Sequence, residues 1–166
     1  ASGQATATLA STAAEVKTLS ILTPAFLTNT AAVTFTPVKL VFGGVSSSLA
    51  TSVCNSLSVS SAGLNGTPGN ILSTTAISLD GGAIGAFYSD AACSSGITSV
   101  TLAAGSPTVN IYYLATTTGS ATLGASAAGL TSASLPITVV SGSGSVWWTW
   151  VSGTSALNDL GNYGAP

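Results

Sequence analysis

The sequence contains no histidine and no methionine, and it has only two basic and four acidic residues in 166. General acid–base catalysis needs a positioned histidine or a pair of carboxylates, whereas the four acids stand far apart, at 15, 80, 90 and 159. Without histidine there is no Ser-His-Asp triad, and a zinc site lacks one of its usual ligands. No phosphate-binding glycine loop precedes a helix. We therefore expect a protein that is not an enzyme and that holds no cofactor or metal.

Charged residues make up only 4% of the chain, against roughly 25% in ordinary soluble domains. With a net charge of −2, the chain has no basic surface for nucleic acid or for an anionic membrane. No apolar run approaches the roughly 20 residues that span a bilayer. So little charge gives little repulsion between copies. We therefore expect neighbouring copies, or a glycan coat, to cover much of the surface.

Two short motifs have both a functional and a structural interpretation. Asn65-Gly66-Thr67 is the single N-glycosylation acceptor, so Asn65 is a candidate glycosylation site; the alternative is an unmodified turn. Asp80 and Asp90 flank the run 83–88 and could together hold Ca²⁺, although two carboxylates make a weak site. Turn capping is the favoured interpretation for both aspartates.

Two cysteines, Cys54 and Cys93, are present. The chain begins Ala1-Ser2 rather than with methionine, which is typical of a chain cut after a secretory signal. We therefore expect an extracellular, cell-surface location, where an even cysteine pair favours a disulfide bond over two free buried thiols. Such a bond would contribute about 4 kcal/mol in the chain-entropy model.

Alternation with a period of two residues dominates the chain and predicts β-strands. In the run 107–115, Val109, Ile111 and Tyr113 share one face. Turns rich in Gly, Asn and Pro separate the runs, and no convincing helix appears. Seven to nine short strands at this spacing predict an all-β, two-sheet sandwich. The expected strands are 36–42, 52–60, 74–79, 83–88, 97–102, 107–115, 120–127 and 135–140.

Residues 38–140 resemble the bacterial immunoglobulin-like domains of secreted adhesins and surface proteins. The resemblance rests on the opening strand Val38–Phe42, on Cys54, and on four further blocks at 85–93, 97–105, 109–113 and 127–132. It implies an immunoglobulin-like sandwich with a Cys54–Cys93 bridge. Such domains usually occur as tandem repeats, whereas this chain holds one copy. We therefore divide the chain into an N-terminal extension (1–35), a sandwich (36–140) and a linker with an aromatic tail (141–166), and expect function in the extensions.

The N-terminal extension contains an alternating run at 3–12, with Ala5, Ala7 and Leu9 on one face and no local hairpin partner. Three interpretations stay open: pairing with the next subunit by β-augmentation, pairing with its own sheet, or lack of order. The layout is similar to that of pilins that assemble by donor-strand complementation. Residues 17–35 predict one or two strands that cover an edge or the bottom of the sandwich, with a short helix at 24–32 as the alternative.

The C-terminal tail follows a Gly/Ser linker at 141–145, which behaves as a flexible chain with an end-to-end distance of about 12 Å. All three tryptophans of the protein lie beyond it. In a strand, Val146, Trp148 and Trp150 would share one face, opposite Trp147, Thr149 and Val151. Both faces would thus be largely apolar, which is typical of a strand covered on both sides. The alternatives are docking on a neighbour, folding back on its own domain, and stacking against carbohydrate.

These patterns predict a structural subunit of an extracellular homopolymeric filament, pilus- or fimbria-like, assembled by strand complementation and apolar tail contacts. Its expected partners are copies of itself, with no nucleic acid and no membrane span. One alternative is a surface adhesin module that binds host or environmental glycans through its tryptophans; another is a capsid or sheath protein. The expected subunit interface comprises Ala5, Ala7, Leu9, Val146, Trp147, Trp148 and Trp150.

Overall fold

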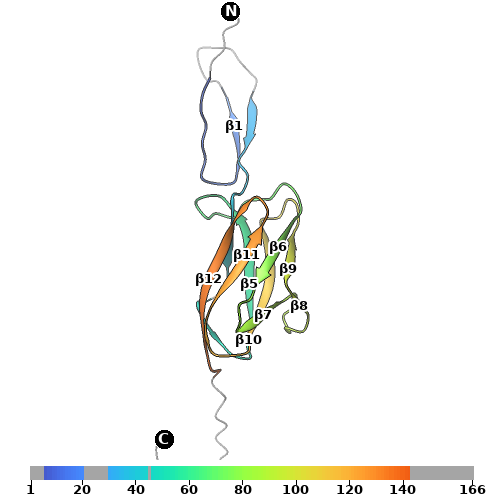
Figure 1. Ribbon diagram of the computed structural model, residues 1–166. Helices are drawn as coiled ribbons and strands as arrows, with labels where there is room; N and C mark the ends of the chain where they lie inside the picture. The colour runs from blue at the N-terminus through green and yellow to red at the C-terminus, as the bar shows by residue number, and fades with distance from the viewer. Residues whose placement is uncertain (1–5, 21–29, 45, 143–166) are drawn as a thin grey trace, which may run out of the picture.

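A computed structural model describes residues 6–20, 30–44 and 46–142 of the chain (Figure 1). Within these residues the protein is all-β, as predicted, and it contains no helix that could span a membrane. A two-stranded sheet near the N-terminus stands beyond one end of a ten-stranded β-sandwich.

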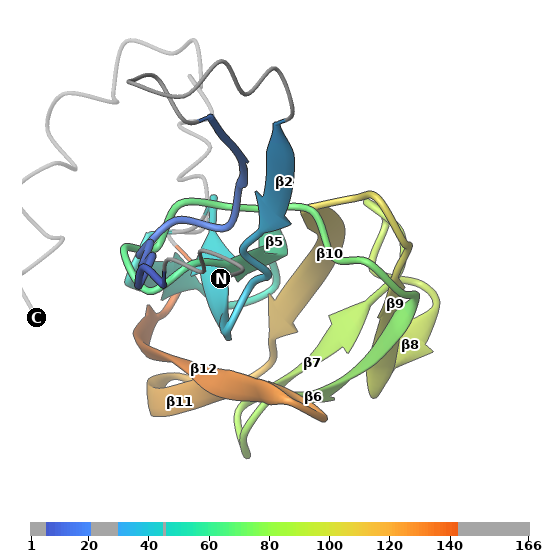
Figure 2. The same cartoon turned by 90° about the horizontal axis from the view of Figure 1, so that it is seen from above.

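The sandwich strands follow one hydrogen-bonded path, β8-β7-β10-β5-β3-β12-β11-β6-β9, with β4 paired to β12. Seen from above, the layer containing β12, β11 and β6 lies opposite that containing β5 and β10 (Figure 2). The bounds are β3 (Lys39–Gly43), β4 (Ser48–Ala50), β5 (Cys54–Ala62), β6 (Thr75–Asp80), β7 (Gly85–Tyr88), β8 (Gly96–Ile97), β9 (Ser99–Leu102), β10 (Thr108–Ala115), β11 (Gly119–Ala127) and β12 (Leu130–Val140).

The first strand of the sandwich joins the two layers along one side. β3 pairs antiparallel with β5 in one layer and parallel with β12 in the other, where Thr131 is opposite Lys39. Further along, β4 continues the parallel pairing with β12, and Thr138 donates to the carbonyl of Ser47 at 2.8 Å. Pro136, two residues before Thr138 on the same edge, has no N–H to offer, which is how natural sheets blunt an edge.

On the opposite side the chain changes layers between β8 and β9, which are separated only by Thr98. Ile97 pairs with Phe87 of β7, and Ser99 pairs with Ser78 of β6. Between them the Thr98 carbonyl accepts a 2.8 Å hydrogen bond from the N–H of Leu79. The chain thus passes from one layer to the other without leaving the hydrogen-bonded path. β8 pairs only with β7, and β9 pairs only with β6, so each of these short strands keeps one edge without a ladder partner.

Large apolar side chains fill the space between the layers. Phe42, Phe87 and Tyr113 form its aromatic centre: Phe42 stacks on Phe87 at 6.4 Å, and Phe87 meets Tyr113 edge-on at 5.2 Å. The Tyr113 hydroxyl donates to the Gly81 carbonyl at 2.8 Å. Gly85 lies so close that an added Cβ would stand 2.6 Å from that hydroxyl. The aromatic ring therefore needs glycine beside it.

The predicted strands match the observed ones closely, with three differences. The last strand, predicted at 135–140, begins five residues earlier, at Leu130. The run 97–102 is divided at Thr98 because the chain changes layers there, and β4 follows 36–42 as a short strand that its polar start concealed. The shared face predicted for Val109, Ile111 and Tyr113 is confirmed, and it faces the core: Ile111 and Tyr113 are fully buried, and Val109 is partly buried against the core.

The expectation for residues 17–35 was wrong in its placement. β1 (Val16–Leu19) and β2 (Ala31–Thr34) do form, but they pair with each other as a separate antiparallel sheet and cover no edge of the sandwich. Each of these strands has its partner strand close by in sequence, so local pairing wins over a longer return to the sandwich. The alternative helix at 24–32 lies mostly outside the described residues.

Candidate functional site

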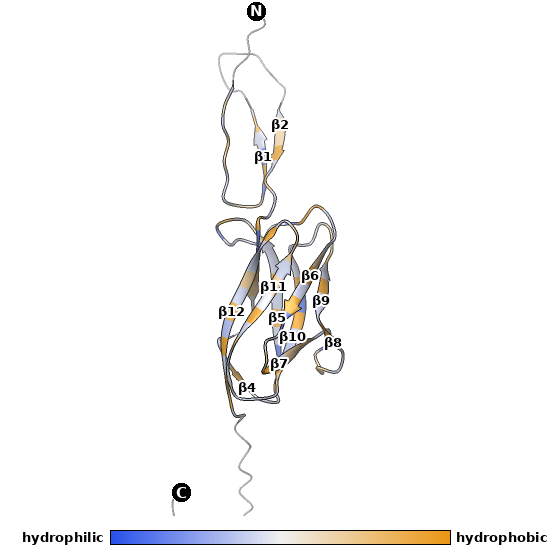
Figure 3. Ribbon diagram, in the orientation of Figure 1, coloured by the Kyte–Doolittle hydropathy of each residue, from blue (hydrophilic) through white to orange (hydrophobic). Residues whose placement is uncertain are grey.

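The projecting hairpin formed by β1 and β2 buries almost none of its own surface. All four side chains of β1 are exposed, and in β2 only Val33 is half-buried. Val16 retains 63% of its accessible surface and Leu19 39%. Figure 3 shows hydrophobic residues on this hairpin as well as along the sandwich strands. A two-stranded hairpin without a packed face is marginally stable in water, so these strands fit a covered environment better than free solvent.

The hairpin also has two open edges, and their free groups can be assigned. Glu15 and Phe35 exchange both backbone hydrogen bonds, at 3.0 and 2.7 Å, and so form a hydrogen-bonded pair. In an antiparallel ladder such pairs alternate with non-bonded pairs, whose N–H and C=O groups point outward. From the register, the outward groups belong to Val16 and Thr18 on β1 and to Ala32 and Thr34 on β2.

Two glycines of the sandwich form a seat for the base of the hairpin. An added Cβ at Gly63 would lie 2.7 Å from the Ala14 backbone nitrogen and 2.8 Å from the Ala13 Cα. At Gly69 an added Cβ would lie 3.0 Å from the Ala14 carbonyl oxygen and would overlap the Ala14 side chain. The N–H of Asn65 donates to the Thr12 carbonyl at 3.1 Å. Because this backbone-to-backbone approach excludes side chains, the hairpin has a defined attachment.

A polar turn leads from this seat into β1. The Ser11 hydroxyl donates to the Glu15 carboxylate at 2.7 Å, and Lys17 lies 3.0 Å from the same carboxylate. The hydrogen bond from Ser11, with that from Lys17, lowers the pKa of Glu15. Both side chains of the ion pair are solvent-accessible, so it adds little stability. It does keep the hairpin free of unpaired charge.

The chain leaves the sandwich at the opposite end. Val140 accepts a 3.0 Å hydrogen bond from the N–H of Thr51, and Gly142 donates to the Thr51 hydroxyl at 3.0 Å. At the hairpin end, by contrast, Thr131 donates to the carbonyl of Val38. β12 therefore runs from the hairpin end to the exit of the chain (Figure 1).

The remaining charged side chains of the described residues have structural partners. Lys39 donates to the Leu64 carbonyl at 2.9 Å, and Asp80 accepts from the N–H of Gly82 at 2.9 Å. Asp90 accepts from the backbone N–H groups of 92, 94 and 95, and the bond from Ser95 is the main cause of its lowered pKa. Turn capping is thus confirmed for both aspartates. Among the described residues, no group of three metal-ligating side chains occurs.

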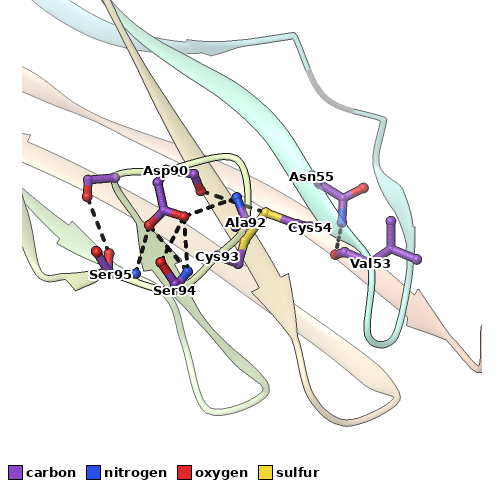
Figure 4. The surroundings of a disulfide bond; sticks show 9 residues. Val53, Cys54, Asn55, Asp90, Ala92, Cys93, Ser94 and Ser95 are labelled. Atoms are coloured by element: carbon purple, nitrogen blue, oxygen red, sulfur yellow. Dashed lines mark hydrogen bonds between the residues drawn. A yellow bond between two sulfur atoms is a disulfide. The ribbon is translucent and has the colours of Figure 1, made fainter.

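The expected disulfide is present and lies beside this Asp90 turn (Figure 4). Cys54 begins β5, and Cys93 follows β7 in a turn, with their Cα atoms 5.9 Å apart. Cys93 adopts a positive φ of 49°, which the capped turn supports. The bond ties the β7–β8 connection to the start of β5.

The candidate glycosylation residue Asn65 is exposed in the loop on which the hairpin is seated. Its side-chain oxygen accepts from the N–H of Thr67 at 3.0 Å, as in an Asx turn. The unmodified-turn alternative therefore has a structural basis, and modification of Asn65 stays a prediction.

The predicted subunit interface is described only in part. Ala7 and Leu9 are exposed and belong to no strand, so the alternation at 3–12 does not form a ladder within the described residues. Ala5, Val146, Trp147, Trp148 and Trp150 lie outside the described residues. Sequence reasoning missed the pairing of β1 with β2. The signal that could have found it was the similar apolar content of the two short runs 16–19 and 31–34, which are close enough in sequence to pair with each other.

The outward face of β10 and β7 carries a second arrangement that the sequence did not single out. Tyr112 lies directly opposite Tyr88 in the ladder, and both are half-buried. Asn110 and Ser58, directly opposite each other on β10 and β5, share this face. The face thus combines two aromatic rings with small hydrogen-bonding side chains.

Comparison with known proteins gives no family for this chain: no family model matches it, and no curated protein matches it. Among solved structures, a glycosyl hydrolase family 2 member from Bacteroides cellulosilyticus matches with 16% identity and a TM-score of 0.46, over 68% of this chain and 16% of that one. A glycosyl hydrolase family 2 member from Bacteroides cellulosilyticus DSM 14838 matches with 16% identity and a TM-score of 0.48, over 66% of this chain and 16% of that one. A β-glycosidase from Bacteroides vulgatus matches with 13% identity and a TM-score of 0.43, over 66% of this chain and 15% of that one. This chain thus spans only a small part of those enzymes.

Proposed function

We propose that this protein is a structural subunit of an extracellular filament that grows by end-to-end contact between copies. The observation that carries the proposal is the hairpin of β1 and β2, whose strands project from one end of a sandwich with their side chains exposed and both edges open. Such a sheet gains stability when another chain covers it.

The arrangement of the chain supports a linear polymer. The hairpin stands at one end of the long axis, and the chain leaves the sandwich at the other. An interface that joins two different ends is heterologous, and it generates open filaments when the rotation between copies does not close. The fixed seat at Gly63 and Gly69 gives that contact a defined direction.

The charge inventory supports a structural rather than a catalytic role. Each charged side chain of the described residues caps a turn, pairs with its neighbour or holds a carbonyl, as in Asp90, Glu15 and Lys39. Among the described residues, the charged groups that general acid–base catalysis would use thus already have structural partners. The Cys54–Cys93 disulfide fits an oxidising, extracellular compartment.

Electron microscopy and sedimentation of the full chain, beside a chain lacking residues 1–35, test this function. The sandwich core begins at Leu40 and includes nothing from residues 1–35, so the shortened chain is expected to fold. Filaments from the full chain and monodisperse monomers from the shortened one are the expected result. A full chain that stays monomeric at all concentrations would rule the filament out.

A second function, glycan binding at the cell surface, is favoured by the outward face of Tyr88, Tyr112, Asn110 and Ser58. Aromatic faces stack on apolar sugar surfaces, and the neighbouring amide and hydroxyl groups suit sugar hydroxyls. Titration of the full chain with oligosaccharides, compared with Tyr112→Ala, tests it. Binding that Tyr112→Ala abolishes would support an adhesin role, and equal behaviour of the two proteins would oppose it.

A further inference from the structure

We propose that the C-terminal segment Val146–Val151 of one copy adds as a third strand to the β2 edge of the hairpin in the next copy. This inference rests on the proposed filament and names the two elements that join its subunits. It assigns the role of donor to the C-terminus and that of acceptor to the N-terminal hairpin.

The choice of acceptor follows from the strand pairing of the sandwich and of the hairpin. β3 with β4 joins the two layers on one side, and β8 with β9 joins them on the other. Within the described residues, the free edges of the sandwich are those of β8 and β9, which belong to a sheet already packed on the core through Ile97 and Leu102. The hairpin offers two, because β1 and β2 pair only with each other.

The β2 edge is the more accessible of the two. In Figure 1 the stretch from residue 6 descends on the β1 side of the hairpin, away from β2. The outward backbone groups on β2 belong to Ala32 and Thr34. A third strand on this edge would also cover Val33 and Ala31, and three strands with an apolar face are the minimum for an independently stable sheet.

The donor follows from chain length and from the place where the described chain ends. Gly142 is fixed to Thr51 at the end far from the hairpin. Between Thr131 and Val140, nine residues of β12 span about 30 Å at ~3.3 Å per residue, and the hairpin lies beyond Thr131. Even Trp150, eight residues past Gly142, reaches at most about 29 Å when fully extended. The tryptophan segment therefore falls short of its own hairpin but can meet that of a copy placed end to end.

The composition of the segment suits this position. A strand with Val146, Trp148 and Trp150 on one face and Trp147 and Val151 on the other brings apolar surface to both faces of the hairpin. Each buried aromatic residue removes about 150–250 Å² from water. The hairpin contributes Leu19, Ala31 and Val33 on one face and Val16 on the other. Its single ion pair, Glu15–Lys17, leaves no unbalanced charge against the tryptophans.

The test uses the fact that all three tryptophans lie beyond residue 142. A chain ending at Gly142 retains the whole sandwich core and the hairpin, and it contains no tryptophan. A synthetic peptide of residues 143–153 is titrated into it while the peptide's tryptophan emission is recorded. We expect a saturable shift of the emission to shorter wavelength, because the indole rings leave water.

Two proline variants of the shortened chain identify the edge. Ala32→Pro removes an outward N–H of β2 and leaves every hydrogen bond between β1 and β2 intact, so peptide binding should weaken roughly tenfold or more. Thr18→Pro does the same on the β1 edge and should leave peptide binding unchanged. Equal binding by Ala32→Pro and the unmodified chain, or loss confined to Thr18→Pro, overturns the assignment.

Electron microscopy of the full chain separates the failure of this inference from that of the proposed function. Filaments from the full chain, together with no emission shift in the peptide titration, overturn the strand assignment and leave the filament standing. Absence of filaments overturns the filament itself.

Discussion

The backbone N–H of Leu79 in β6 donates a 2.8 Å hydrogen bond to the carbonyl of Thr98, the single residue between β8 and β9. At that residue the chain leaves the side of Phe87 in one layer and joins the side of Ser78 in the other. This contact extends the pairing of β6 with β9 by one residue, up to the point where the chain changes layers.

The edges of the sandwich bear on where a copy could add a strand. Donor-strand assembly requires an open edge or groove. Strand changes at both sides protect much of the sandwich edge, and the free edges of β8 and β9 belong to a sheet already packed on the core. The exposed hairpin therefore becomes the acceptor in our proposal, in place of the sandwich. Pro136 strengthens the same protection at β12, since it removes an N–H from the part of the edge that neither β3 nor β4 covers.

The seat of the hairpin should not tolerate a side chain at Gly63. In Gly63→Ala the new Cβ meets the backbone of Thr12, Ala13 and Ala14, so the hairpin must shift while the sandwich core stays intact. We expect faster amide exchange in residues 6–20, loss of filaments, and an unfolding midpoint little changed. Gly96→Ala is the matched control, because its Cβ meets atoms only at 4.0 Å. Equal exchange in the two variants would contradict a fixed seat.

The Tyr113 hydroxyl should stabilise the sandwich through its bond to Gly81. Tyr113→Phe leaves a carbonyl without its partner, at a cost of about 1–2 kcal/mol in the free energy of unfolding, measured by urea denaturation. Tyr112→Phe, on the outward face, should change it by less than about 0.5 kcal/mol. A similar effect of both substitutions would refute the role of the buried hydroxyl.

The same tyrosine should make stability depend on alkaline pH. Burial raises the pKa of Tyr113, so its contribution is complete below the ordinary tyrosine pKa of about 10 and is lost as the pH rises through the raised value. Unfolding midpoints measured from pH 8 to 12 should fall less steeply in Tyr113→Phe than in the unmodified protein.

The disulfide should contribute about 4 kcal/mol to the free energy of unfolding, because it closes a loop of 39 residues. We expect Cys54→Ser combined with Cys93→Ser to lower the urea midpoint accordingly. Reduction of the unmodified protein should give the same change. A loss below about 1 kcal/mol would mean that the Asp90 turn holds the β7–β8 connection without the covalent bond.

Acid should weaken this turn first. Backbone hydrogen bonds, chiefly from Ser95, lower the pKa of Asp90. Because the pKa is lower in the folded state, the ionised carboxylate contributes stability at pH values above the ordinary aspartate pKa of about 3.9. This contribution is lost as the pH falls through the lowered pKa. Asp90→Asn should therefore reduce stability at neutral pH and flatten the acid loss between about pH 4 and 2.

Urea midpoints across that pH range measure this effect, and Asp80→Asn is the comparison. Asp80 accepts one backbone bond, from Gly82, whereas Asp90 accepts bonds from three residues. Acid profiles of the same shape in both variants would contradict a special role for Asp90.

Local pattern was enough to predict the sandwich strands. Alternation placed Val109, Ile111 and Tyr113 on one face, and it located nearly all sandwich strands to within a few residues, because side chains on a half-buried strand must alternate. It failed at Thr98, since a change of partner strand alters no side-chain period. It also failed for β1 and β2, whose alternation shows that they are strands but not which strand each one pairs with.

By itself, the sequence determined that the described residues form strands and that the two cysteines pair, whereas the expectation that its few charges leave no catalytic group stays a prediction. The strands follow from the local alternation of side chains, and the cysteine pairing follows because the chain has only two cysteines. Only the tertiary structure decided that β3 joins the two layers of the sandwich and that the hairpin stands at the end opposite Gly142 (Figure 1). Both depend on hydrogen bonds between residues distant in sequence, such as Thr131 to Val38 and Asn65 to Thr12. No local pattern encodes such a choice of partner, because every strand edge offers the same N–H and C=O groups.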